Sequence, residues 1–279
     1  MTEVGVPKQS PHPPHRIHAG KPISERFYRA SMGDRFHSWT LACEESDLWI
    51  GVDPASWSPA MEGLARKTLL EARAELESYG ASHPGPSGFF ASLEPLENDV
   101  SAPRLISTML AAARTTATGK SPGVGPMAAV AGAVAEHVGR ALQDAFYCAE
   151  IIVENGGDLW LAFARPLEIA VFAGDSPLSG LIGVEIDPEL SPCGLCTSSG
   201  TTGPSLSFGY ADAAVALCRD AAKADAWATS LGNMIQSAAD IEPTLEQLRE
   251  AKELLGALII VGDRMGIRGQ FRLKLLKKA

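Results

Sequence analysis

The chain of 279 residues is long enough for one domain or two modest ones, and its 46% hydrophobic and 20% charged residues are ordinary for a packed globular protein. Its 33 acidic residues outnumber 24 basic ones, and the resulting formal net charge of −9 argues against a broad nucleic-acid-binding surface. No apolar run approaches the roughly 20 residues that cross a bilayer, no secretory signal is visible, and five cysteines make no disulfide framework, so we expect a cytoplasmic protein.

The first half of the chain predicts a tail, a hairpin and three helices. Residues 1–20 are rich in Pro, His and Lys and hold almost nothing that a core could bury, which predicts a disordered tail. Alternating large and small residues from Phe36 to Val52 predict a hairpin with an acidic turn. Apolar residues at every third or fourth position predict a helix from Pro59 to Gly80. We expect a short helix over 103–114 and a helix of very small side chains from Pro126 to Val138.

The second half alternates short apolar runs with turn residues and then returns to helices. Four such runs predict an antiparallel meander: 150–154, 159–164, 167–173 and 181–186. We expect a further strand over 213–218, a helix over 220–234, and a third long helix after Pro243 whose apolar face includes Leu254 and Leu255. A final hairpin is expected to pair 258–261 with 271–275. Several antiparallel strands with a few long helices predict an α+β fold.

A glycine-rich segment, Gly123-Val-Gly125-Pro126, precedes the helix of small side chains. The start of a helix exposes unpaired N–H groups and the positive end of the helix dipole, so it attracts phosphate, and glycine lets a ligand approach the backbone. Gly125 is therefore a candidate for phosphate binding. A loop that turns into a Pro-started helix explains the same residues without a ligand.

The sequence Asn155-Gly156-Gly157-Asp158 lies between two predicted strands. Asn-Gly is a strong signal for a tight hairpin, and that role is sufficient for the backbone of the turn. It leaves the flanking acids Glu154 and Asp158 unexplained, and plain turn acids would fit there as well.

Hydroxyls and glycines cluster after Cys196, where we expect a polar loop. Such a loop offers many donors to an anion or a sugar, and the candidate binding residues in it are Thr197, Ser198, Ser199, Gly200 and Thr201. A plain polar loop is an equally good reading. Cys193 and Cys196 form a Cys-x-x-Cys pair without the second pair that a four-thiolate metal site needs, and a redox role is a weaker alternative.

Asp225 and Thr229 are four residues apart on a predicted helix and so share one face. A carboxylate and a hydroxyl are both oxygen donors and suit Mg²⁺ that also holds substrate phosphates. An exposed Asp and a helix-facing Thr would show the same spacing, and spacing alone favours that reading.

Four segments taken together resemble the uncharacterised ApbE-like protein family, a relative of the FAD:protein FMN transferases. They are GVGPMAAVAGAVAEHVGR, VENGGD, CTSSGTTGPSLSFGYADA and ADAWATSLGN, in this order along the chain. The resemblance runs from about Tyr28 to Gln270. It implies an α+β architecture of the T-fold type, with long helices packed on antiparallel sheets, in a single domain over residues 21–279.

The resemblance also implies a cofactor and a metal. The related transferases bind FAD across a cleft with Mg²⁺ at the pyrophosphate, and they move FMN onto a threonine hydroxyl of a target protein with release of AMP. Their metal-binding Asp and Thr match Asp225 and Thr229, and their third ligand, a backbone carbonyl, would come from near Ala128. Their Gly-Gly-Asp near the flavin cleft matches Gly156, Gly157 and Asp158.

Two departures from the transferases stand out. They carry a Lys and an Asp in the segment that matches residues 125–132, and this chain has neither. The close family usually reads Gly-His-Ser where this chain has Gly203-Pro204-Ser205.

Two hypotheses follow. The chain is either a Mg²⁺-dependent flavin or nucleotide pyrophosphate transferase or hydrolase that uses FAD, or a non-catalytic flavin- or nucleotide-binding protein that has lost the transferase chemistry. We expect a small-molecule partner, neither nucleic acid nor membrane, and a homodimer as one way to cover an exposed sheet.

Overall fold

The computed structural model describes residues 35–118, 121–200 and 208–276, and these residues belong to one compact unit, Asp34–Ala279. The predicted disordered tail, residues 1–20, lies outside the described residues. None of the described helices is long and apolar enough to cross a membrane.

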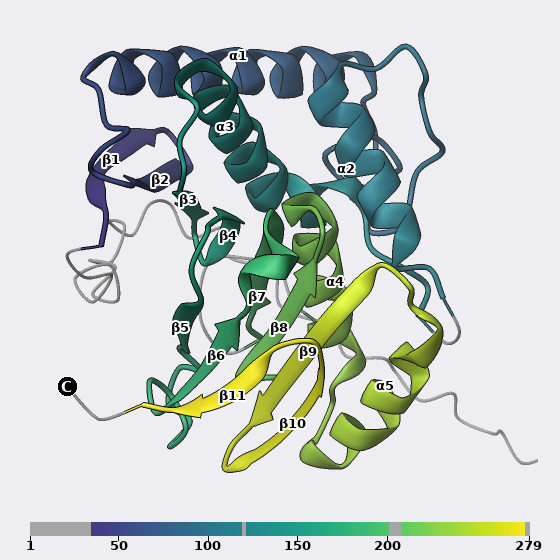
Figure 1. Cartoon of the computed structure of the whole chain (residues 1–279). Coiled ribbons are helices and arrows are strands. Elements are labelled where there is room, and N and C mark those ends of the chain that lie inside the picture. The colour runs from purple at the N-terminus through teal and green to yellow at the C-terminus, as the bar shows by residue number, and fades with distance from the viewer. Residues whose placement is uncertain (1–34, 119–120, 201–207, 277–279) are drawn as a thin grey trace, which may run out of the picture. The chain divides into compact units, whose positions relative to one another are not determined.

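Runs of strands and runs of helices follow one another along the chain, as in an α+β fold (Figure 1). The helices are α1 (Ala60–Ser82), α2 (Arg104–Thr115), η2 (Pro126–Ala129), α3 (Val130–Phe146), η3 (Pro188–Leu190), α4 (Ala221–Met234), η4 (Ala238–Asp240), α5 (Ile241–Gln247) and η5 (Leu248–Glu250). The strands are β1 (His37–Cys43), β2 (Ser46–Val52), β3 (Ile151–Asn155), β4 (Asp158–Ala162), β5 (Leu167–Val171), β6 (Ile182–Ile186), β7 (Cys193–Ser198), β8 (Ala213–Cys218), β9 (Leu254–Val261), β10 (Arg264–Gly269) and β11 (Arg272–Leu275).

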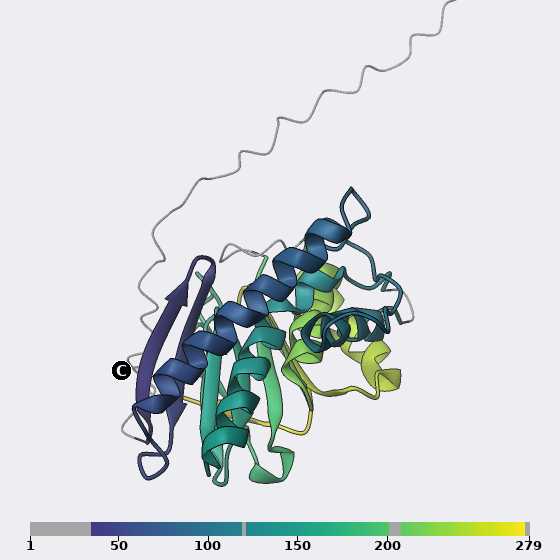
Figure 2. The ribbon, with the colours of Figure 1, turned by 90° about the horizontal axis from the view of Figure 1, so that it is seen from above.

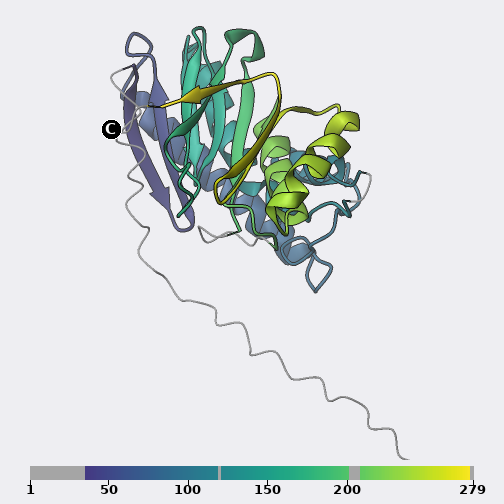
Figure 3. The same cartoon turned by 90° about the horizontal axis from the view of Figure 1, so that it is seen from below.

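The strands form two antiparallel sheets. The larger has the order β1-β2-β3-β4-β7-β8-β9-β10, and the smaller has the order β11-β6-β5. Figure 2 shows α1 and α3 lying across one side of the strands, and Figure 3 shows β11 crossing them on the side away from α1. Side chains of the central strands are buried on both sides because each face of the large sheet is covered.

The hairpin and the helices predicted in the first half are confirmed: the β1–β2 hairpin turns at Glu44 and Glu45, and α1 and α2 begin directly after Pro59 and Pro103. The helix of small side chains begins as the short 3₁₀ helix η2 and continues as α3. The mixed α+β class is confirmed as well.

The predicted meander is wrong in its pairing. Two pairs, β3–β4 and β5–β6, are present, but β4 pairs with β7, and β5 and β6 belong to the small sheet. β5 exposes Glu168, whereas every residue of β4 is buried. A strand with a solvent-exposed side chain suits the small sheet, because the middle of the large sheet is covered on both faces.

The polar loop predicted from Cys196 onward is wrong over its first three residues, because Cys196, Thr197 and Ser198 complete the strand β7. The small residues of this strand let α4 approach closely. A Cβ on Gly194 would lie 2.3 Å from the Cα of Ala221, at the start of α4.

The C-terminal predictions need two corrections. The third long helix is only α5 and η5, and Leu254 and Leu255 begin the strand β9, whose β-branched residues pair with β8. β9 pairs with β10 across a two-residue turn at Gly262 and Asp263, and β11 pairs with β6 instead. The Gly-Asp turn signal identifies this hairpin better than the apolar residues after it do.

Candidate functional site

Three of the segments singled out in the sequence meet at the first turn of α3. The Oδ2 atom of Asp225, on α4, accepts a hydrogen bond from the backbone N–H of Gly132 at 2.9 Å. The side-chain amide of Asn155, at the end of β3, donates to the backbone carbonyl of Ala131 at 3.2 Å. The helix of small side chains, the β3–β4 turn and the Asp225 helix are therefore in contact.

The β3–β4 turn positions Asn155 and Asp158 opposite each other in the strand ladder. Gly156 and Gly157 have φ of 73° and 105°, backbone conformations that strongly favour glycine. The N–H of Gly157 donates to the Glu154 carboxylate at 2.7 Å, and Asp158 accepts from the N–H of Thr197 at 3.3 Å. Glu154 and Asp158 thus accept hydrogen bonds from the backbone of the β3–β4 turn and of the neighbouring strand β7.

The two carboxylates Asp158 and Asp225 are both 8% exposed. Burial raises the pKa of Asp225 well above its usual range, and the negative charge of Asp158 raises that pKa further. The N–H groups of Gly132 and Ala131 oppose this shift, and no cation is among the described groups that act on this carboxyl. A cation would relieve the repulsion between these two carboxylates, so the donor set fits Mg²⁺.

Asp225 also has a role in the fold. The N-cap residue of α3, Ala129, has no side chain that can accept from the first turn. Asp225 supplies that acceptor from α4, which accounts for one of its two oxygens.

Thr229 lies one turn after Asp225 on α4 and is half-buried. Ala128 is half-buried in η2, which packs against α4, and its N–H donates to the carbonyl of Gly125 at 3.1 Å. Among the described residues, no group of three or more His, Cys, Asp and Glu is arranged to hold a metal ion. The predicted magnesium ligands are a different kind of group, because they combine the Thr229 hydroxyl and the Ala128 backbone carbonyl with carboxylates.

Gly125 is buried, and protein backbone lies where its side chain would be. A Cβ at this position would lie 1.8 Å from the carbonyl oxygen of Ser92. The neighbouring N–H of Val124 donates to the Thr116 hydroxyl at 3.1 Å. Packing accounts for this glycine, and phosphate binding by it stays a prediction.

The predicted hydroxyl cluster is only partly within the described residues. Thr197 and Ser198 end β7, and Ser198 is buried. Ser199 is half-buried and Gly200 is exposed, with its N–H bonded to the carbonyl of Ala211 at 2.9 Å. Thr201 lies outside the described residues.

A comparison with known families bears on these segments directly. The family described as "AbpE bacteria" matches residues 29–265, most of the chain and all four segments.

The chain belongs to this family.

The sequence resemblance to ApbE-like proteins is confirmed by this match, and curated relatives extend the comparison. The UPF0280 protein of Methanocella arvoryzae is 41% identical over 203 residues, which cover 73% of this chain and 78% of the relative. The UPF0280 protein of Methanococcus aeolicus is 37% identical over 211 residues, which cover 74% of this chain and 81% of the relative. The names of these relatives state no activity.

Solved structures share the fold of this ApbE-like chain. The flavin transferase ApbE from Vibrio cholerae has a TM-score of 0.53 at 11% identity and covers 83% of this chain and 96% of its own. The apo form of the Pseudomonas stutzeri flavinyl transferase ApbE has a TM-score of 0.52 at 14% identity, with 84% and 95% covered. At these identities the similarity confirms the predicted ApbE-like architecture and nothing beyond it.

The Cys-x-x-Cys pair of this ApbE-like chain does not have the properties of a redox pair. Cys193 and Cys196 are three residues apart on one strand, so their side chains face opposite sides of the sheet. Burial raises the pKa of Cys193 to about 12 and raises the pKa of Cys196 well above its usual range. Thiols of this kind are inert.

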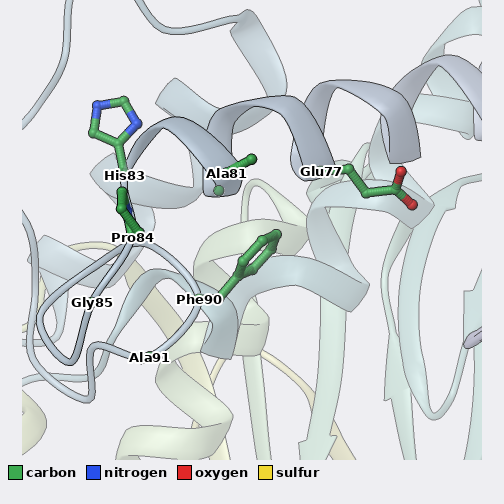
Figure 4. A pocket seen from close by; sticks show the side chains of 8 residues that line it. Glu77, Ala81, His83, Pro84, Gly85, Phe90 and Ala91 are labelled. Atoms are coloured by element: carbon green, nitrogen blue, oxygen red, sulfur yellow. The ribbon is translucent and has the colours of Figure 1, made fainter.

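A pocket also lies away from the predicted residues, at the C-terminal end of α1 (Figure 4). The Phe90 ring lies beneath the helix there, and a Cβ on Gly80 would come within 1.9 Å of that ring. The residues that line this pocket are mostly apolar, and Glu77 and His83 are the titratable ones among them. It contains none of the predicted site residues.

Sequence reasoning missed Glu136. It is a buried carboxylate on α3, whose oxygen accepts from the N–H of Ala221, the first residue of α4. A carboxylate among small apolar residues in a helix was the available signal, since such a group needs a partner when it is buried.

Proposed function

We propose that this ApbE-like protein is a Mg²⁺-dependent flavin-nucleotide transferase or pyrophosphate hydrolase that uses FAD. The observation that carries the proposal is the buried pair Asp158 and Asp225, joined to the first turn of α3 and to the β3–β4 turn. FAD is a flavin nucleotide with a pyrophosphate, and flavin transfer is the activity named for the structural neighbours.

Asp225, Thr229, the Ala128 carbonyl and Asp158 are the residues that would hold Mg²⁺. The bound ion would neutralise the pyrophosphate and polarise the phosphorus. Gly157 would give the substrate room at the turn, because a Cβ added there meets only the Thr197 carbonyl, at 4.0 Å. Asn155 would keep the α3 turn against the sheet while substrate is bound.

The test is incubation of the purified chain with FAD and Mg²⁺, with AMP release followed by chromatography. We expect AMP from the wild type and a loss of at least ~10-fold in Asp225→Asn, since weakening a metal site typically costs 10–100-fold. Asp144→Asn, an exposed aspartate on α3, is the matched control and should match the wild type. Absence of AMP with the wild type, or full activity in Asp225→Asn, would contradict the proposal.

A second candidate function is binding of a flavin or nucleotide without turnover. It is favoured by the sequence of residues 125–132, which includes η2 and the start of α3 and has neither the Lys nor the Asp that the transferases carry there. FAD with Mg²⁺ would then raise the melting temperature, because a ligand that binds only the folded state stabilises it, and no AMP would appear. The same samples distinguish the two functions.

A further inference from the structure

Helices α3 and α4 hold each other through two reciprocal hydrogen bonds. Asp225 of α4 accepts from the N–H of Gly132 at 2.9 Å, and Glu136 of α3 accepts from the N–H of Ala221 at 2.7 Å. On α3, Glu136 lies four residues, about one turn, after the donor Gly132. On α4, Asp225 lies four residues after the donor Ala221. We refer to Gly132, Glu136, Ala221 and Asp225 as the α3–α4 clasp.

The two helices touch at the clasp without an intervening side chain. A Cβ on Gly132 would lie 2.2 Å from the carbonyl oxygen of Ala221 and 2.9 Å from the Cβ of Asp225. Because Asp225 lies one turn after Ala221 on the same helix, a displacement of the first turn of α4 relative to α3 displaces the Asp225 carboxylate as well.

The hydrogen bond from Ala221 to Glu136 is additional to the ordinary cap of α4. Asp220 already accepts from the N–H of Lys223 at 2.9 Å, in the usual manner of an N-cap residue. Glu136 instead joins the helix start to α3. Glu136 is 8% exposed, so this contact between helices is made by a buried carboxylate.

Arg140 connects the Glu136 carboxylate to the large sheet. Its Oε1 atom accepts from Nε of Arg140 at 2.7 Å, and the Arg140 guanidinium lies over the Trp160 ring, 5.7 Å from the centroid. Trp160 is two residues after Asp158 on β4, so both side chains share one face of the sheet. Arg140 and Glu136 thus connect the strand that carries Asp158 with the helix that carries Asp225.

We propose that Glu136 is a positioning residue, which sets the place of the Asp225 carboxylate relative to Asp158 by fixing the first turn of α4 on α3. The inference rests on the proposed function, in which these two carboxylates hold a divalent cation. Glu136 does not touch the cation in this proposal and acts through Asp225.

The first arm of the test measures Mn²⁺ affinity by electron paramagnetic resonance of the free ion, with Mn²⁺ as the probe for Mg²⁺. We expect Glu136→Ala to weaken binding at least ~10-fold, as the loss of an outer partner of a metal site does. Glu136→Gln keeps an oxygen that accepts from Ala221 and should stay within about threefold of the wild type. Val138→Ala, a buried apolar truncation on the same helix, controls for general destabilisation and should also stay within about threefold.

The second arm needs no metal. Amide hydrogen exchange at Gly132, the donor to Asp225, should be at least ~10-fold faster in Glu136→Ala than in Val138→Ala. Unchanged exchange at Gly132, unchanged Mn²⁺ affinity in Glu136→Ala, or a Glu136→Gln variant as weak as Glu136→Ala would overturn the proposal. A wild-type chain that binds no Mn²⁺ would contradict the proposed function instead, and the exchange arm would still decide the role of Glu136.

Discussion

At the scale of single residues, Glu150 is a buried carboxylate that two arginines hold in its charged form. Its carboxylate, 4% exposed, is paired with the guanidinium groups of Arg35 and Arg165 and accepts from the N–H of Ala164 at 3.1 Å. The hydrogen bonds from Arg35, followed by those from Arg165 and Ala164, lower the pKa of Glu150 to about 2 against the opposing effect of burial. Charged Glu150 therefore stabilises the folded state.

This pKa predicts an acid-sensitive stability. The carboxyl has a lower pKa folded than unfolded, so its contribution is complete above about pH 4.5 and is lost as the pH falls toward about 2. We expect this group to account for up to about 3 kcal/mol of the free energy of unfolding lost across that window. Urea unfolding at a series of pH values should show a shallower loss in Glu150→Gln than in the wild type.

The control for this measurement is Asp144→Asn, which changes an exposed carboxyl and should keep the wild-type pH dependence. Equal pH slopes for Glu150→Gln and the wild type would show that the ion pairs around Glu150 do not stabilise the fold.

At the scale of elements, the contact between α3 and α4 depends on the absence of a side chain at Gly132. The nearest atoms to an added Cβ are backbone atoms of Ala221, which cannot move aside alone. Gly63 on α1 is the opposite case, because it is exposed and an added Cβ has no neighbour within 4 Å.

Substitution by alanine should therefore have opposite effects at the two glycines. We expect Gly132→Ala to lower the free energy of unfolding by roughly 1–3 kcal/mol, the usual cost of overpacking. Gly63→Ala should raise it by about 0.5–1 kcal/mol, because alanine loses less backbone freedom in a helix. Urea denaturation measures both, and a Gly132→Ala variant as stable as the wild type would contradict the close helix contact.

Local patterns predicted the elements better than they predicted their partners. The repeat of apolar residues identified α1, and the Asn-Gly signal identified the turn between β3 and β4, because both signals lie within a few neighbouring residues. The pairing of β4 with β7 depends on which strand is covered on both faces, a property of the whole sheet. β7 was missed because its small residues look like a loop until α4 is packed against them.

The candidate site was also predicted only in part. Spacing placed Asp225 and Thr229 on one helix face, and the family resemblance added the β3–β4 turn. The electrostatic interaction of Asp158 with Asp225 joins residues far apart in the sequence, so local patterns could not predict it. Glu136 was not predicted at all, since its partner is a backbone N–H that only the packed helices bring near.

At the scale of the whole molecule, the family match begins at residue 29, after the segment 1–20 that the sequence predicts to be a disordered tail. We expect deletion of residues 1–20 to change the melting temperature by no more than about 2 °C and to leave FAD-dependent AMP release unchanged, because such a segment buries almost nothing. Differential scanning fluorimetry and the AMP assay check this. A large loss of stability would show that these residues pack on the domain.

The homodimer stays a prediction. Of the described strands, β1 and β10 are the outer members of the large sheet, and an outer strand with free backbone groups is where a second copy could pair. Sedimentation or light scattering would decide it.

The burial of the cysteines has a practical consequence for labelling. Of the five cysteines, all in the described part of the chain, Cys43 is half-buried and the other four are buried. A maleimide reagent should therefore modify the native protein at one position, on the outer strand β1, without any prior mutagenesis. A fluorophore attached there would lie on one of the two outer strands at which a second copy could pair, and its emission would report pairing at β1 as the protein is diluted.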